Sequence, residues 1–111
     1  GENATNRKFD SIFTANTLHI MSANSVENFF RGTARHLYTS GLLLVYGPFK
    51  YDGGFTTESN ALFDQWLKEK DPMSGVRDFE WITTIGTKNN LKLIEDNAMP
   101  ANNRMLVWAK L

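Results

Sequence analysis

His19 is the side chain of this sequence best suited to move a proton, because the pKa of an imidazole lies near neutrality. The second histidine, His36, follows Arg35 and is expected on the solvated side of a helix. Two histidines without a cysteine or an HExxH pattern do not make a metal site, and no GxSxG or other nucleophile motif is present. His19 is therefore either a general base or an ordinary loop histidine.

Further polar and aromatic side chains fall in loops that should meet at one edge of a sheet. In an open α/β sheet, ligands bind at the carboxyl ends of the parallel strands. Loops 16–23, 47–57 and 99–103 are expected there, with the segment 72–78 beside them. They carry residues that could line a pocket, namely His19, Phe49, Lys50, Tyr51, Arg77, Asn102 and Asn103. The structural alternatives stay open: loop aromatics packed on a helix, asparagines that form a turn, and Asp78 as a helix cap.

The first half of the chain predicts a strand, a helix and a second strand. The run 9–16 (FDSIFTAN) predicts a mostly buried strand. Asn24 is expected to cap a helix, with Glu27 completing a capping box, and Ser40-Gly41 to end it. The continuous apolar run 42–46 (LLLVY) indicates a strand covered on both faces. These elements form a βαβ unit, whose crossover should be right-handed.

The second half predicts two helices and a hairpin. Thr57 should cap a helix that ends at Pro72, and its expected buried face carries Leu62, Phe63, Trp66 and Leu67. A further helix runs from Asp78 to Asn89-Asn90, with Phe79, Ile82 and Ile85 packed inward. Trp81 is also at core spacing and is expected to pack rather than bind. Strands over 91–98 and 104–111 are joined by the turn 99–103, so they pair antiparallel. The expected element order is β-α-β-α-α-β-β, an α/β fold with three parallel strands and an antiparallel last strand.

The composition is that of a single globular domain. The chain has 111 residues, of which 41% are hydrophobic and 22% charged. Lys+Arg and Asp+Glu number 12 each, and the resulting zero net charge argues against a nucleic-acid partner. The absence of cysteine excludes disulfide scaffolds. The longest apolar run is far shorter than the roughly 20 residues of a membrane helix. We expect a cytoplasmic protein that binds no membrane, with residues 1–8 disordered.

The first strand has an uncovered side. It is apolar and has no strand before it, so at the margin of a sheet its backbone groups are unpaired and its side chains prone to association. Either another chain covers it, or the rest of its own sheet lies elsewhere. The sequence therefore predicts a homodimer through Phe9–Asn16 or pairing with further polypeptide.

Five runs of the sequence resemble the C-terminal half of the methyltransferase-like protein 26 family: FDSIFTANTLHIMS (9–22), GLLLVYGPFKYDG (41–53), SNALFDQWLKEKDP (59–72), GVRDFEW (75–81) and EDNAMPANNRMLVW (95–108). This is a family of uncharacterised class I methyltransferase-like proteins that depend on S-adenosylmethionine (SAM). The resemblance implies the C-terminal half of a Rossmann-like fold, whose strands correspond to the fourth to seventh of a seven-stranded sheet.

The resemblance also assigns roles to residues. It implies that Asn16, Thr17 and Leu18 border SAM, with His19 near the incoming substrate as a possible base. It implies that the methyl acceptor contacts Phe49, Lys50, Tyr51, Asn102, Asn103 and Arg104. The Gly-rich loop that cradles the methionine end of SAM, and the acidic residue that binds its ribose, are not in this chain. Gly53-Gly54 is the one glycine pair, and it follows no GxG pattern.

Two functions remain open at this point. In the first, the chain carries the acceptor side of a SAM-dependent methyltransferase and is inactive alone, its acceptor being an unidentified small molecule or other group. In the second, it is a non-enzymatic α/β module that self-associates through its first strand.

Overall fold

The computed structural model describes residues 7–111 and confirms an α/β fold with a mixed sheet. The predicted disorder of residues 1–8 falls mainly on 1–6, which lie outside the described residues. The elements in chain order are β1 (Phe9–Ala15), η1 (Leu18–Ile20), α2 (Ala23–His36), β2 (Leu37–Gly47), β3 (Phe49–Lys50), α3 (Glu58–Lys70), β4 (Arg77–Asp78), α4 (Phe79–Lys88), β5 (Leu91–Met99), η2 (Pro100–Asn102) and β6 (Asn103–Lys110).

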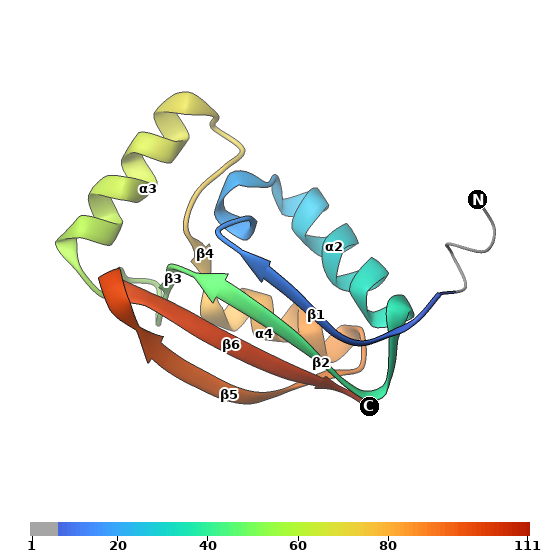
Figure 1. Cartoon of the computed structure of the whole chain (residues 1–111). Coiled ribbons are helices and arrows are strands. Elements are labelled where there is room, and N and C mark those ends of the chain that lie inside the picture. The colour runs from blue at the N-terminus through green and yellow to red at the C-terminus, as the bar shows by residue number, and fades with distance from the viewer. Residues whose placement is uncertain (1–6) are drawn as a thin grey trace.

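The main sheet has four strands in the order β1-β2-β6-β5 (Figure 1). β1 pairs parallel with β2, and β6 pairs antiparallel with both β2 and β5. Strands β1, β2 and β5 therefore point the same way, and their carboxyl ends lie at one edge. A second, two-stranded sheet joins β3 and β4 in parallel just beyond the end of β2. The two short strands were not predicted from the sequence.

One hydrophobic core lies between the sheet and helices α2 and α4. Alternation along β2 turns Leu43 and Val45 toward these helices, where both side chains are buried. Trp108 of β6 packs edge-on against Phe30 of α2, with ring centroids 5.4 Å apart. In Figure 1, α4 lies behind the sheet and α2 runs alongside β1. The prediction that β2 is covered on both faces is therefore wrong within the described residues.

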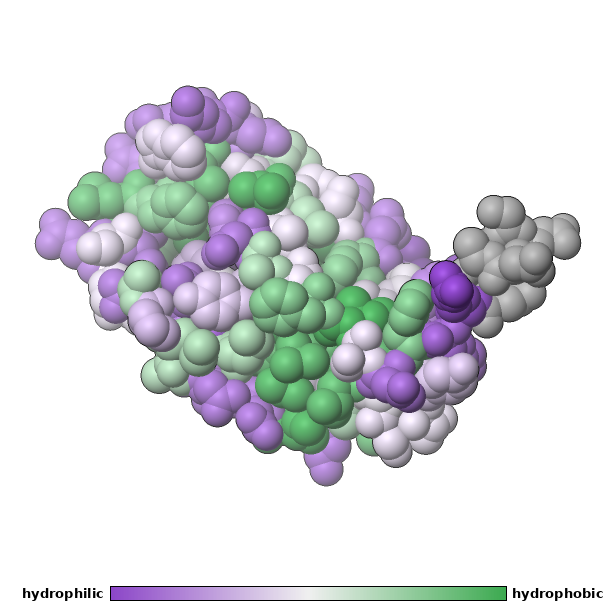
Figure 2. Space-filling model, viewed as in Figure 1, coloured by the Kyte–Doolittle hydropathy of each residue, from purple (hydrophilic) through white to green (hydrophobic). Residues whose placement is uncertain are grey.

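The other face of the sheet is apolar and open. Phe13 pairs with Leu44, and both alternate with neighbours that face the core, so they lie on this second face together with Leu42. Phe13 is 61% exposed. Figure 2, in the same view, shows an apolar band across this side of the molecule. The expected burial of the first strand is wrong here, because β1 is an edge strand with nothing on its outer side among residues 7–111.

Helix α2 begins and ends earlier than the sequence indicates. Ser22 is its N-cap, and the Ser22 hydroxyl accepts a hydrogen bond from the backbone N–H of Ser25 at 3.2 Å. The predicted cap, Asn24, is already helical. The helix ends at His36, and Leu37 starts β2 by pairing with Phe9. The predicted stop at Ser40-Gly41 instead lies within β2, in the irregular stretch between the Phe9–Leu37 and Ser11–Leu42 pairs, where Ser40 has a φ of 70°.

Helix α3 packs a different face against the rest of the protein than its apolar pattern predicts. Asn60, Asp64 and Leu67 are buried, whereas Leu62 is 60% and Trp66 51% exposed. The prediction that Leu62 and Trp66 pack in a core is wrong, because polar Asn60 and Asp64 turn inward to hydrogen-bond the strand-end loops. In Figure 1, α3 stands apart from the sheet, above the carboxyl ends of the strands.

Candidate functional site

Two strand-end segments are fastened together beside the end of β1. The backbone N–H of Gly75 donates to the carbonyl of His19 at 2.8 Å. The Arg77 guanidinium donates to three backbone carbonyls, those of Leu18, Met21 and Met73. The η1 loop and the segment before β4 are therefore held together by hydrogen bonds, most of them from the Arg77 side chain.

His19 lies inside this unit and is 7% exposed. Its ring meets Phe63 of α3 edge-on, with centroids 5.3 Å apart. Burial lowers the pKa of His19, and the positive charge of Arg77 lowers it further, so the imidazole is neutral at pH 7. Among residues 7–111 no hydrogen bond to a ring nitrogen of His19 is formed, and neither nitrogen is a fully buried polar atom left without a partner, a state found there only for Trp108 Nε1. A neutral imidazole with no protein partner for its ring nitrogens is able to accept a proton.

Helix α3 joins the loops at this edge through one helical stripe. Asp64 accepts a hydrogen bond from the backbone N–H of Val76 at 2.8 Å and pairs with Lys68 at 3.1 Å. Asn60 donates to the carbonyl of Asn102 in the β5–β6 turn. Sequence reasoning missed Asn60 and Asp64. The available signal was their spacing with Phe63, since positions separated by three and four residues share one helix face.

Tyr51, Asp96 and Arg104 form a second cluster at the same edge. The Tyr51 hydroxyl donates to Asp96 Oδ2 at 3.0 Å, and Arg104 Nε donates to Asp96 Oδ1 at 2.8 Å. Burial raises the pKa of Tyr51, and the hydrogen bond to Asp96 raises it further. The Tyr51 ring also stacks on Phe79 at 4.8 Å. These contacts hold the segment after β3 against the hairpin, and they engage the Tyr51 hydroxyl and Arg104 Nε, two of the groups expected to contact an acceptor.

The residues expected to border SAM occupy different environments. Asn16 ends β1 with a φ of 55°, is exposed, and donates its backbone N–H to Tyr46 O at 2.8 Å. Asparagine tolerates this left-handed conformation better than most residues. The Thr17 hydroxyl shares a hydrogen bond with Thr14 at 2.6 Å. The side chain of Leu18 is buried in the core. Of the three, only Asn16 presents a side-chain polar group openly to solvent.

The remaining predicted acceptor residues fall into separate groups. Phe49 is buried in the core. Lys50 lies 3.8 Å from Asp78 and lines a cavity of about 350 Å³, which it shares with Arg77. A second cavity of about 270 Å³ lies between the start of α3 and the hairpin, and it is lined by Asn102, Asn103 and Arg104. The structure thus places these residues at one edge without joining them in a single pocket.

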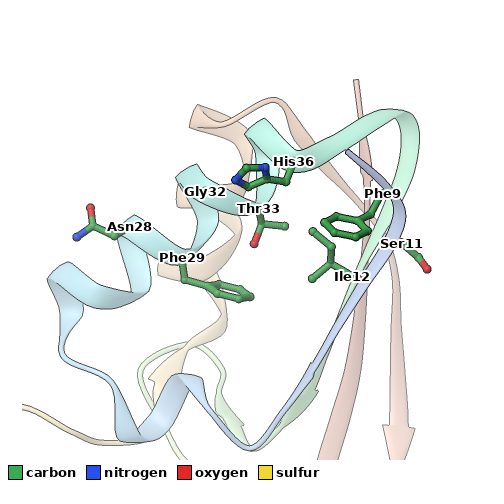
Figure 3. Close-up of a pocket in the computed structure, with 8 residues that line it drawn as sticks. All are labelled: Phe9, Ser11, Ile12, Asn28, Phe29, Gly32, Thr33 and His36. Atoms are coloured by element: carbon green, nitrogen blue, oxygen red, sulfur yellow. The ribbon is translucent and has the colours of Figure 1, made fainter. Parts of the chain in front are cut away.

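The largest cavity described here lies away from this edge. It has a volume of about 590 Å³ and lies between β1 and α2. Figure 3 shows Phe29 and Thr33 of α2 pointing toward Phe9 and Ile12 of β1 across it, with His36 at one end. His36, expected to be solvated, is half-buried there, and its Nδ1 hydrogen-bonds the backbone carbonyl of Arg7 at 3.0 Å. The groove follows the unpaired edge strand.

The described residues offer neither a metal site nor a membrane-spanning helix. Within residues 7–111, no three side chains of His, Asp or Glu lie close enough to hold a metal ion. None of the helices in that range combines the length and the apolarity that a membrane crossing requires.

Comparison with known proteins gives a family and a fold. Residues 1–110 match the family described as "Protein of unknown function (DUF938)". An O-methyltransferase family 2 protein from Planctomyces limnophilus, solved with apigenin, matches with a TM-score of 0.85 at 16% identity, over 94% of this chain and 31% of its own. An O-methyltransferase family protein from Burkholderia thailandensis matches with a TM-score of 0.83 at 16% identity, over 98% of this chain and 32% of its own.

A third match has a bound product of the cofactor. CalO1, a methyltransferase in calicheamicin biosynthesis solved in its SAH-bound form, has a TM-score of 0.76 at 14% identity over 92% of this chain and 30% of its own. The chain therefore has a methyltransferase-like fold and spans about a third of the length of these structures.

Proposed function

We propose that this chain, which belongs to the DUF938 family, forms the acceptor side of a SAM-dependent methyltransferase, within the methyltransferase-like protein 26 group. The observation that carries the proposal is the fit of 94% of the chain to a continuous fold found in O-methyltransferases, at a TM-score of 0.85. On this proposal the four strands of the main sheet, in the order β1-β2-β6-β5, correspond to the fourth to seventh strands of a seven-stranded sheet.

On this proposal, the described residues would contact one side of a SAM molecule. Asn16 offers an exposed carboxamide at the tip of β1, but Thr17 is already hydrogen-bonded and Leu18 lies in the core. None of the described strands is followed by a Gly-rich loop of the kind that cradles the methionine end of SAM. When bound, SAM would supply the methyl group that its positively charged sulfonium sulfur carries. Its binding requires a second wall from polypeptide paired with β1, so the isolated chain should not retain it.

In this proposal, His19 accepts the proton of the acceptor's nucleophile. The supporting observation is an imidazole that is 7% exposed and whose pKa is lowered by burial and by the charge of Arg77. Phe63 and the backbone contact to Gly75 fix the position of the ring. The acceptor would contact Lys50 and the cavity lined by Asn102, Asn103 and Arg104, with Phe49 and Tyr51 acting as the packed support behind them.

The uncovered edge of β1 favours pairing with further polypeptide of the same fold. Its inner edge pairs with β2, its outer edge is unpaired within residues 7–111, and the strand has no lysine or proline to protect that edge. A parallel strand added there would connect to β1 through a right-handed crossover, which places the connecting helix on the same face as α2. The groove of Figure 3 lies at that position.

Titration calorimetry tests the proposal directly. The chain alone should give no heat with SAM, and the chain mixed with the N-terminal half of a DUF938 protein should bind it. If the two halves associate and still do not bind SAM, the methyltransferase proposal is wrong. In the assembled protein, His19→Gln should lower the methyl-transfer rate by about 10²–10⁴-fold, as expected for the loss of a general base, while His36→Gln leaves it unchanged.

The second candidate, a self-associating module, is favoured by the same exposed edge and has a separate test. Sedimentation of the chain would show a dimer that Phe13→Lys dissociates. Ile94→Lys is the matched control, because Ile94 is an exposed strand residue, 47% accessible, on the opposite edge strand β5. A monomer at high micromolar concentration would exclude this candidate. That result would leave the calorimetric test with SAM unchanged, so the two candidates are tested separately.

A further inference from the structure

Five cationic side chains converge on one cavity at the end of the molecule opposite the strand-end loops. The cavity has a volume of about 330 Å³ and is lined by Lys8, Arg31, Arg35, Lys88 and Lys110. The remaining lining residues are apolar or neutral, namely Ala34, Leu37, Thr39, Asn89 and Asn90. No carboxylate of residues 7–111 lines it. Lys8 lies just before β1, and the other lining residues come from the second half of α2, the start of β2, the end of α4 with the residues after it, and the end of β6, which meet near the C label in Figure 1.

The charges at this cavity form no ion pair with an acidic side chain of residues 7–111. None of the five cations forms an ion pair within residues 7–111, where the ion pairs are Lys50–Asp78, Lys68–Asp64 and Arg104–Asp96. Arg31 donates to the neutral carboxamide of Asn28, and Lys110 donates to a main-chain oxygen of Leu111, the last residue of the chain. Glu27 does not line this cavity, but it lines a neighbouring hollow together with Arg31 and Lys88, so these two cations lie between Glu27 and the cavity.

Overall basicity does not account for this clustering. The chain has 12 basic and 12 acidic residues, yet five of the 12 basic residues face a single cavity. Arg31 and Arg35 lie four apart on α2, a spacing at which like charges destabilise a helix. Favourable interaction with helix C-termini explains Arg35 and Lys88, which lie in the last turns of α2 and α4. It does not explain Lys8 and Lys110, which flank strands.

We propose that this cavity binds a compact polyphosphate anion, such as an inorganic triphosphate or the triphosphate of a nucleotide. Phosphate oxygens accept hydrogen bonds from lysine and arginine, and charge-assisted contacts of this kind are the strong ones. A concave site of one charge sign also concentrates counter-ions of the opposite sign. The volume is at the lower end of the range for ligand pockets, about 300–1,000 Å³, which suits a small anion. The neutral carboxamides of Asn89 and Asn90 can donate further hydrogen bonds to it.

This site is independent of the proposed methyl transfer. His19 and the loops around it follow the carboxyl ends of β1 and β2, whereas the cationic cavity lies at their amino ends. Success or failure of SAM binding therefore says nothing about the anion, and the two can be measured separately on the same protein.

Calorimetry with inorganic triphosphate tests the inference on the 111-residue chain. We expect one site per chain, with affinity falling about fivefold or more between 50 and 200 mM NaCl because the contacts are ionic and partly exposed. Arg35→Gln/Lys88→Gln should weaken binding about tenfold or more. Lys68→Gln/Lys70→Gln removes the same charge from α3, which lies at the other end of the molecule. This control should leave the affinity within about twofold of the unsubstituted chain, since salt screens charges that far from the cavity almost completely.

Three outcomes would overturn the inference. The first is no heat with triphosphate at low salt from a chain whose circular dichroism and melting are those of a folded protein. The second is equal weakening by both double variants, which would show a non-specific charge effect. The third is tight, salt-dependent binding of a 20-nucleotide RNA that triphosphate does not displace, which would mark a nucleic-acid surface instead.

Discussion

Replacing Asp64 by alanine is expected to lower the free energy of unfolding by about 3 kcal/mol, because it strands a buried amide N–H. Asp64 is buried, and its Oδ1 accepts from Val76 N at 2.8 Å. A hydrogen bond to a charged group is worth about 1.5–3 kcal/mol, and an orphaned buried donor costs about 1–3 kcal/mol. The ion pair with Lys68 contributes less than about 1 kcal/mol, because the lysine side chain is half exposed.

Two matched variants separate these contributions. Asp64→Asn keeps an oxygen that can accept from Val76 and is expected to cost about 1 kcal/mol, which reflects loss of the charge alone. Lys68→Met removes only the ion pair and is expected to cost less than about 1 kcal/mol. Urea denaturation of the four proteins gives the values. The reasoning is refuted if Lys68→Met destabilises the chain as much as Asp64→Ala does.

Asp64→Ala should also loosen the segment that hydrogen-bonds His19. Val76 adjoins Gly75, whose N–H donates to the His19 carbonyl at 2.8 Å. Loosening this segment should accelerate hydrogen exchange of the Gly75 amide in Asp64→Ala but not in Lys68→Met. Unchanged exchange at Gly75 would show that α3 does not hold the His19 loop in place.

The remaining predictions concern the space around two glycines and the pH dependence of stability. Gly86→Ala should destabilise the chain by about 1–3 kcal/mol, because its Cβ would lie 2.8 Å from Trp108 Nε1. Gly32→Ala, whose Cβ meets nothing within 4 Å, should stabilise α2 by about 0.5–1 kcal/mol, and thermal unfolding that showed it destabilising would contradict this. Burial raises the pKa of Tyr51, so the native state keeps a proton that the unfolded chain loses. Urea titrations should therefore show stability falling above about pH 10, with less fall in Tyr51→Phe. Burial lowers the pKa of His19, so the unfolded chain binds the proton more readily. Stability should fall below about pH 6.5, by at most about 1.4 kcal/mol per pH unit for this group, and an equal slope in His19→Gln would refute its contribution.

Local signals in the sequence were enough to predict the strong elements. The apolar run 42–46 lies within β2, and Thr57 caps α3 by accepting from Asn60 N at 3.1 Å. The boundary at Leu37 was missed because it depends on a partner distant in sequence. Leu37 pairs with Phe9, and this contact ends α2 at a place where the helical pattern alone would continue.

The candidate site was harder to predict because its contacts are long-range. Tyr51 and Asp96 lie 45 positions apart, and nothing in either local sequence indicates that they meet. The loop placement of His19 followed from the end of β1, but its burial depends on Arg77, 58 positions away, and on α3. Trp66 was misplaced because hydrophobicity was given more weight than the hydrogen-bonding needs of Asp64 on the neighbouring face of the helix.

The position of β6 has a consequence during protein synthesis. This last strand lies between β2 and β5, and residues 42–47 of β2 pair with residues 104–109. The inner edge of β2 must therefore stay unpaired while about 60 residues are translated, which takes roughly 3–12 seconds at typical ribosomal rates. During that interval the nascent chain exposes an apolar strand that chaperones recognise. A premature stop before residue 103 would remove the middle of the sheet rather than its margin.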